Sequence, residues 1–219
     1  MNIFKRLAEK PWLAQPDTVV DLRTASYAAS NQKVALVVFL AIVGVLFFLF
    51  FAAYHMRLEP LEFGGQQTDW VPMPEPPLLW FNTIVLGLAS VAYEWARRAC
   101  NRGQTGTAKL AFLIAGGITL AFLALQLVVW NQLIARGYYA YANPANSFFY
   151  LITGVHGVHL LGGLVAWARA SRRFAASDAE GVDPADVNVR LRRSVDLCAL
   201  YWHFLLLIWL GMLALFVNT

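Results

Sequence analysis

Three histidines lie inside strongly apolar stretches, where ionisable side chains are costly. His156 and His159 stand three residues apart within 147–168, and His203 lies within 195–217. An ionisable group at membrane depth needs a hydrogen-bonding partner or a function. Three imidazoles could together ligate zinc, copper or a haem iron. Any chemistry of this chain would therefore arise where these two stretches meet.

A structural role explains the same histidines without a cofactor. Neutral imidazoles can hydrogen-bond between membrane helices and fix their register. No fourth ligand accompanies the three histidines, and Gly154 and Gly157 would admit another backbone on the opposite side of the helix. We predict a structural contact between 147–168 and 195–217, and metal or haem ligation remains the alternative. The predicted contact residues are His156, His159, Trp202, His203, Gly154 and Gly157.

The composition is that of an integral membrane protein. Of the 219 residues, 59% are hydrophobic and only 14% are charged. Five continuous apolar stretches approach the roughly 20 residues that a spanning helix needs. We therefore predict an all-α fold, a polytopic bundle of five transmembrane helices in one domain, 34–219, preceded by a cytoplasmic or interfacial arm, 1–33. The predicted spans are 34–54, 78–96, 110–134, 147–168 and 195–217.

The basic residues predict the orientation of the chain. Fifteen of the seventeen lie on the arm and on alternate connections, and only Arg57 and Arg136 lie on the other side. The positive-inside rule places the amino terminus in the cytoplasm and the carboxyl terminus in the periplasm. This distribution fits a membrane surface rather than a nucleic acid. The predicted lipid contacts are Arg57, Arg97, Arg98, Arg172 and Arg173.

Few other polar groups lie within the predicted spans. Asn82 and Thr83 in one span, and Gln126 in the next, require partners in neighbouring helices or in the backbone. Glu94 precedes Arg97 and Arg98 by three and four residues, which predicts a local ion pair. No carboxylate occupies the middle of a span, and no internal repeat is present, so an ion pump or a small transporter is disfavoured.

Four short segments together resemble subunit III of the haem-copper oxygen reductases, the cytochrome c and quinol oxidases. TGVHGVHLLGG at 153–163 resembles the family's TGxHGxHxxxG signature, and YWHFLLLIWL at 201–210 resembles WHFxDxxW. WFNTIVLGLAS at 80–90 is similar to WLNTxxLxxSS, and FAAYHMR at 51–57 to AAYxxxR. The segments occur in the family's order in four of the five predicted helices. The chain resembles the five-helix form of the family.

The resemblance implies an accessory subunit of an aerobic respiratory oxidase, a translocase of a bacterial inner membrane. This chain would hold no cofactor and no catalytic residue, whereas haem and copper would lie in its partners, the catalytic subunit I and subunit II. The family stabilises subunit I, supports proton uptake and binds phospholipid between its helices. A respiratory supercomplex is a further possible setting. The resemblance gives neither the electron donor nor the haem type.

Two positions depart from the family pattern. Val43 stands where the family has a buried glutamate, and Leu206 stands where it has an acid after WHF. Roles of those carboxylates therefore do not carry over to this chain. The departures leave open a divergent branch serving a nitric oxide reductase. A self-contained haem or metal enzyme remains the alternative of another class.

Overall fold

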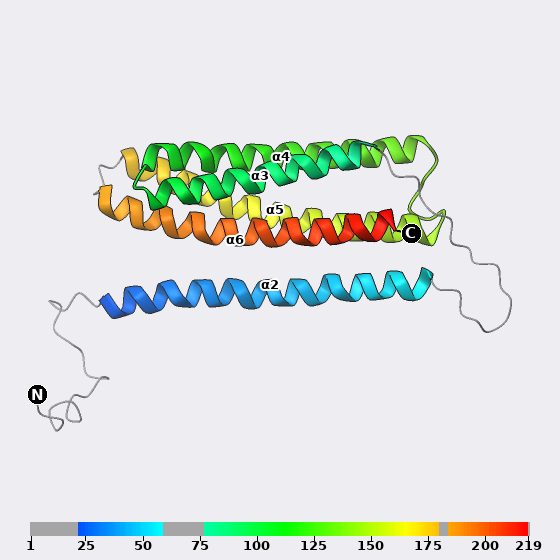
Figure 1. The fold of residues 1–219 in the computed structure, drawn as a ribbon, viewed down its shortest axis with the longest axis horizontal. Coiled ribbons are helices and arrows are strands. Elements are labelled where there is room, and N and C mark those ends of the chain that lie inside the picture. The colour runs from blue at the N-terminus through cyan, green and yellow to red at the C-terminus, as the bar shows by residue number, and fades with distance from the viewer. Residues whose placement is uncertain (1–21, 59–76, 180–183, 219) are drawn as a thin grey trace, which may run out of the picture. The chain divides into compact units, whose positions relative to one another are not determined.

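The computed structural model describes residues 22–58, 77–179 and 184–218, and their regular structure is α-helix throughout. The chain divides into two compact units, Met1–Ala35 and Leu36–Thr219, of which the second contains the helix bundle. The five helices are α2 (Leu22–Leu58), α3 (Pro77–Asn101), α4 (Thr105–Ala135), α5 (Pro144–Ala179) and α6 (Pro184–Val217) (Figure 1).

Each predicted span lies inside one of these helices, which confirms the five-span fold. The portions long and apolar enough to cross a membrane are Asn31–Leu58, Pro77–Asn101, Thr105–Ala135, Pro144–Ala175 and Val187–Val217. The helices are longer than the predicted spans because polar residues continue them beyond the apolar stretches. In particular, α2 begins at Leu22, inside the predicted arm, whereas residues 1–21 of that arm lie outside the described residues.

Helix ends follow local sequence signals. Proline is the first residue of α3, α5 and α6, a position where its missing N–H costs no hydrogen bond. Before α5, the side chain of Asn143 accepts a hydrogen bond from the Ala145 N–H at 3.1 Å. Gly103 and Gly137 follow the ends of α3 and α4 with φ of 74° and 89°, a region that favours glycine. The short connection after Asn101 returns the chain so that α3 and α4 run antiparallel (Figure 1).

Small residues bring α3 and α4 together. Alanines recur at intervals of three and four on both helices and are buried, so the two backbones can approach closely. These buried alanines are Ala89, Ala92, Ala96 and Ala99 of α3, with Ala108, Ala111 and Ala115 of α4. The larger core side chains, including Tyr93, Phe112 and Trp202, fill the space toward α5 and α6.

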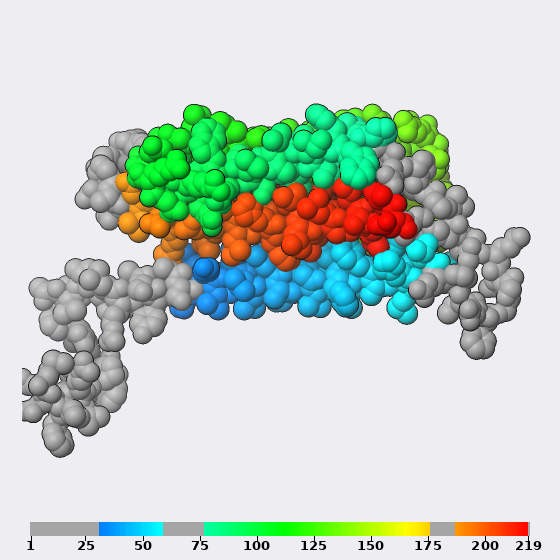
Figure 2. Space-filling view, viewed as in Figure 1, coloured from blue at the N-terminus to red at the C-terminus, as the bar shows by residue number. Residues whose placement is uncertain are grey.

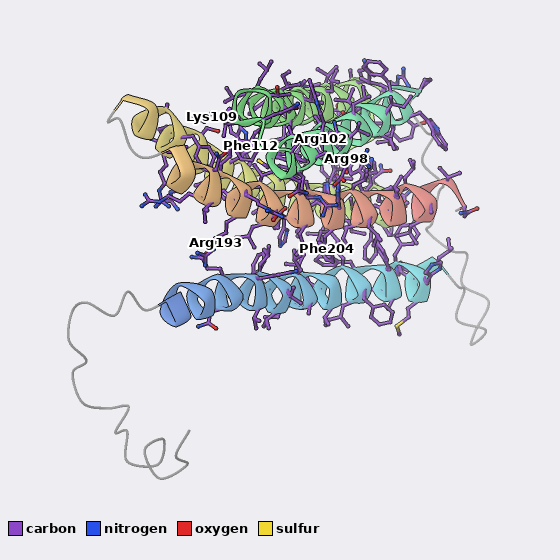
Figure 3. All side chains as sticks on the ribbon, turned by 60° about the vertical axis from the view of Figure 1, so that its left-hand side comes forward. Arg98, Arg102, Lys109, Phe112, Arg193 and Phe204 are labelled. Carbon is purple, nitrogen blue, oxygen red and sulfur yellow. The ribbon has the colours of Figure 1, made fainter. Side chains whose placement is uncertain are left out.

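From Leu36 onward, α2 packs through aromatic side chains rather than through small ones. The rings of Phe47 and His159 lie 5.7 Å apart, and the Tyr54 ring lies 5.6 Å from Phe148 of α5. The Phe204 ring of α6 lies against α2, since a Cβ added at Gly44 would lie 3.7 Å from its Cζ (Figure 3). Aromatic rings at such contacts hold the two backbones further apart than alanines do.

Candidate functional site

His156 lies at the centre of the bundle and is 1% exposed. Its ring centroid lies 5.3 Å from that of Trp209, and 6.3 Å from those of Phe47 and Phe122. Neither ring nitrogen has a hydrogen-bond partner among the described residues. The three rings come from α6, α2 and α4, so His156 of α5 contacts each of the other helices that surround it.

His159 stands one turn further along α5 and is half-buried. Its Nδ1 donates to the carbonyl of Val155 at 2.8 Å, within its own helix. The backbone carbonyl of His159 accepts a hydrogen bond from the Tyr201 hydroxyl at 2.7 Å. This bond joins α5 to α6 through Tyr201, which was not among the predicted contact residues. Its only sequence signal was its place beside Trp202.

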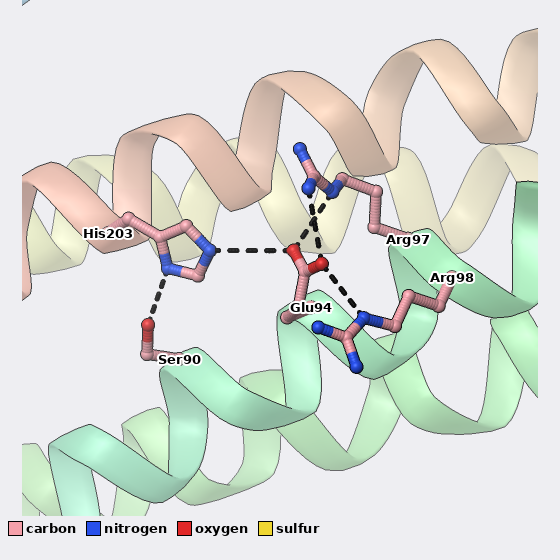
Figure 4. Close-up of polar contacts among 5 residues, drawn as sticks. All are labelled: Ser90, Glu94, Arg97, Arg98 and His203. Atoms are coloured by element: carbon pink, nitrogen blue, oxygen red, sulfur yellow. Dashed lines mark hydrogen bonds and ion pairs between the residues drawn. The ribbon is translucent and has the colours of Figure 1, made fainter.

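Trp202 and His203 both reach α3. The Trp202 ring stacks on that of Tyr93, with centroids 5.2 Å apart and an interplanar angle of 13°. Nδ1 of His203 and Oγ of Ser90 form a hydrogen bond of 2.5 Å, and Nε2 lies 3.8 Å from Oε2 of Glu94 (Figure 4). His203 therefore tethers α6 to α3, on a different contact from that of the other two histidines.

The three histidines do not converge on one point. His156 lies among aromatic rings, His159 bonds to its own helix, and His203 pairs with α3. Within the ranges that the structure describes, no group of three or more His, Cys, Asp or Glu side chains could hold a metal ion. In this geometry the three imidazoles lie apart, each beside different residues.

The glycines that pack tightly are not those predicted. A Cβ at Gly154 would meet the Trp130 ring of α4 at an ordinary 3.6 Å, and one at Gly157 would meet nothing within 4 Å. In contrast, a Cβ at Gly163 would lie 2.5 Å from the Tyr201 ring, and one at Gly116 would lie 2.0 Å from the Trp167 ring. The close contacts of α5 with α6 and α4 therefore form where glycine accommodates an aromatic ring.

The polar side chains within the spans find partners in neighbouring helices. Nδ2 of Asn82 donates to Oε1 of Gln126 at 2.8 Å, which links α3 to α4 in the buried core. The hydroxyl of Thr83 donates to the Leu79 carbonyl and accepts from Nε1 of Trp209 at 2.9 Å, which links α3 to α6. Each of these side chains thus has a partner in another helix or in the backbone, whereas Oδ1 of Asn82 and Nε2 of Gln126 are buried without one among the described residues.

The predicted ion pair on α3 is present. The carboxylate of Glu94 accepts hydrogen bonds from Arg97 and Arg98, each at 3.1 Å. Arg98 lies in the last turn of α3, Arg102 in the connection that follows it, and Lys109 in the second turn of α4 (Figure 3). The other predicted lipid contacts are exposed on their helices, namely Arg57 of α2 with Arg172 and Arg173 of α5.

Comparison with known proteins relates the chain to respiratory oxidase subunits. The profile of the family described as cytochrome c oxidase subunit III matches residues 23–218. Cytochrome c oxidase subunit 3 of Latimeria chalumnae is 32% identical over 181 residues, and the alignment covers 76% of this chain but 61% of that protein. Cytochrome bo(3) ubiquinol oxidase subunit 3 of Pseudomonas aeruginosa is 29% identical over 171 residues, covering 76% of this chain and 74% of that protein. A probable cytochrome c oxidase subunit 3 of Mycobacterium bovis is 26% identical, with 66% and 68% covered.

Proposed function

Because the chain belongs to the cytochrome c oxidase subunit III family, we propose that it is an accessory subunit of a haem-copper terminal oxidase. It would brace the catalytic subunit I, beside subunit II, while those partners hold the haem and copper. The chain itself would hold neither. Since it spans about three fifths of the length of the Latimeria relative, the activity and the partners of the complex are part of the proposal.

The use of the three histidines carries this proposal. The three lie in separate surroundings: His156 lies among rings of α2, α4 and α6, the His159 ring lies near Phe47 of α2, and His203 bonds to Ser90 of α3. Among the described residues, His203 hydrogen-bonds to another helix, His159 hydrogen-bonds within its own, and neither ring nitrogen of His156 has a partner. Side chains used in this way support a scaffold function better than a self-contained haem or metal enzyme, which would need them at one centre.

Co-purification tests the proposed function. We expect the chain, tagged and isolated from its own membranes under mild detergent, to bring with it a haem-bearing complex that reduces oxygen. The visible spectrum should follow the partner subunits and disappear when this chain is separated from them. Reduction of nitric oxide instead of oxygen would favour the divergent branch. Purification of this chain alone, with iron or copper bound to it, would contradict the proposal.

The distribution of charge supports the orientation that we propose in the membrane. We place the connection between α3 and α4, and the segment that joins α5 and α6, on the cytoplasmic side of the bacterial inner membrane, since both carry basic clusters. The amino terminus would then be cytoplasmic and the carboxyl terminus periplasmic. Arg97, Arg98, Arg172 and Arg173 would lie at the level of the cytoplasmic headgroups, and Arg57 at the opposite surface.

A cavity between α2, α5 and α6 supports the proposed binding of phospholipid. It has a volume of about 400 Å³ and is lined mainly by apolar side chains, including Phe39, Ala166 and Leu197. Arg193 lies one turn before Leu197 on α6 (Figure 3), and its Nε and Nη2 are buried without a hydrogen-bond partner among the described residues. An acyl chain of the phospholipid would occupy the cavity. The phosphate of the same lipid would pair with the Arg193 guanidinium.

Filling the cavity should release the lipid. Gly162 lines the cavity, and a Cβ there would meet no atom within 4 Å, so Gly162→Leu should place its side chain in the cavity without distorting the helix. We expect native mass spectrometry of the purified complex to show loss of a bound phospholipid. Gly157→Leu is the matched control, since Gly157 also faces open space but does not line the cavity. Equal lipid content in both variants would refute the assignment.

A further inference from the structure

Three buried polar side chains keep unused hydrogen-bonding atoms inside the bundle. His156 of α5 is 1% exposed, and neither of its ring nitrogens has a partner among the described residues. Asn82 of α3 bonds to Gln126 of α4, yet Oδ1 of the first and Nε2 of the second are buried without a partner in the described part of the chain. The side chains of α3 and α6 meet in a continuous surface over this interior (Figure 2). A buried donor or acceptor without a hydrogen bond is costly, so these atoms call for a partner.

The register of α4 against α5 places two of these side chains at one level. Nε1 of Trp130 on α4 donates to Oγ1 of Thr153 on α5 at 3.3 Å. Gln126 lies four residues before Trp130, and His156 lies three residues after Thr153. Because the two helices run in opposite directions (Figure 1), both side chains are displaced from that contact in the same direction, by about 6 and 4.5 Å of helix rise. Gln126 and His156 therefore lie at nearly the same height.

Trp209 of α6 connects this level to α3. Its ring lies 5.3 Å from that of His156, and its Nε1 donates at 2.9 Å to Oγ1 of Thr83, the residue after Asn82. Phe122 of α4 makes an edge contact with Trp209 at 4.9 Å but stands 6.3 Å from the smaller ring of His156. Ring packing against the imidazole is therefore looser on the side of α4.

The unused atoms match a ligand that both donates and accepts hydrogen bonds. A neutral imidazole offers one N–H donor and one acceptor nitrogen, Gln126 offers a donor, and Asn82 offers an acceptor. A cation would oppose the N–H groups and an anion would oppose the acceptors, so a charged ligand would leave part of the set unpaired. A water molecule can accept from Nε2 of Gln126, donate to Oδ1 of Asn82 and form a third bond with His156. About three such bonds are usual for a buried water.

We propose that Asn82, Gln126 and His156 bind one internal water molecule, which joins α3, α4 and α5 by hydrogen bonds. Gln126 then serves two neighbours, Asn82 through Oε1 and the water through Nε2. His156 gains a polar partner inside a ring of aromatic side chains. The site lies wholly within this chain, so it does not depend on which complex the chain belongs to.

Solid-state NMR of the full-length chain in lipid bilayers tests this inference. With isotopically labelled histidine, polarisation is transferred for a short time from water protons to the ring nitrogens. The signals of His156 are assigned by their disappearance in His156→Phe. Because this ring is 1% exposed, a transfer from water to it reports an internal molecule rather than bulk solvent. We expect that transfer in the wild type, and a His156 ring that receives none would overturn the inference.

Gln126→Met distinguishes a bridging water from one held by His156 alone. Methionine fills nearly the same space as glutamine but has no donor, so the transfer from water to His156 should be lost. Gln132→Met is the matched control, since it makes the same change at an exposed position of α4, and it should keep the transfer. An unchanged signal in Gln126→Met would contradict the proposed site.

A measurement on the amide of Gln126 does not depend on the folding of any variant. In the wild-type chain with isotopically labelled glutamine, Nε2 of Gln126 should also receive polarisation from water, although this side chain is only 5% exposed. A Gln126 amide that receives none would refute the bridge.

Discussion

Gly116→Leu is expected to lower the free energy of unfolding of this chain by about 3 kcal/mol, toward the upper end of the usual cost of overpacking. Even a Cβ at this position would lie 2.0 Å from Cε2 of the Trp167 ring. The ring cannot move freely, since its Nε1 donates to the Phe112 carbonyl at 2.8 Å. Leucine would therefore separate α4 from α5 or break this hydrogen bond.

The neighbouring glycine provides the control for this substitution. Gly117 is exposed, and a Cβ there would meet nothing within 4 Å. Gly117→Leu should change the free energy of unfolding by about 0.5 kcal/mol or less. Reversible unfolding of the purified chain in mixed micelles, followed by tryptophan fluorescence, measures both variants. Equal stability of the two would show that α4 and α5 do not meet at Gly116.

Trp209→Ala is expected to cost about 3 to 5 kcal/mol, as large-to-small substitutions of buried aromatic residues do. The side chain is 2% exposed. Its ring makes an edge contact with Phe122 at 4.9 Å and lies 5.3 Å from His156. Its Nε1 also donates to Thr83 across to α3. Truncation would thus weaken the contacts of α6 with α3, α4 and α5 at once.

A second variant at Trp209 separates the contribution of its hydrogen bond from that of its ring contacts, and a variant at Trp80 is the control. Trp209→Phe keeps most of the ring contact but loses the hydrogen bond, so we expect it to cost about 1 to 2 kcal/mol. Trp80→Ala removes a tryptophan that is 49% exposed and should cost about 0.5 kcal/mol or less in the isolated chain. The same unfolding measurement applies. If Trp209→Ala were no more harmful than Trp80→Ala, the central position of Trp209 would be wrong.

Features that depend on residues close in the sequence could be predicted. The five spans could be recognised because lipid requires about 20 apolar residues and an internally bonded backbone, whichever helices surround them. The ion pair of Glu94 with Arg97 and Arg98 could be predicted because a helix brings residues three and four apart together. Membership of the family could be recognised because its short motifs lie in four of the helices.

The choice of partners across helices could not be predicted. The sequence shows that Asn82 and Gln126 each need a hydrogen bond, but not that they meet each other. It groups His203 with His156 and His159, whereas the structure turns His203 toward Ser90. It marks Gly154 and Gly157 as contact positions, but the tight contacts form at Gly116 and Gly163.

The sequence by itself determined that this chain has five helices long and apolar enough to cross a membrane, belongs to the subunit III family and pairs charges locally on α3. Only the tertiary structure decided which helix each histidine contacts, which glycine accommodates a ring and which buried polar groups lie at one level. The physical reason is that local periodicity fixes which side of a helix a residue occupies. The neighbour on that side depends on how all five helices pack together, and that packing is set by side-chain shapes far apart in the sequence.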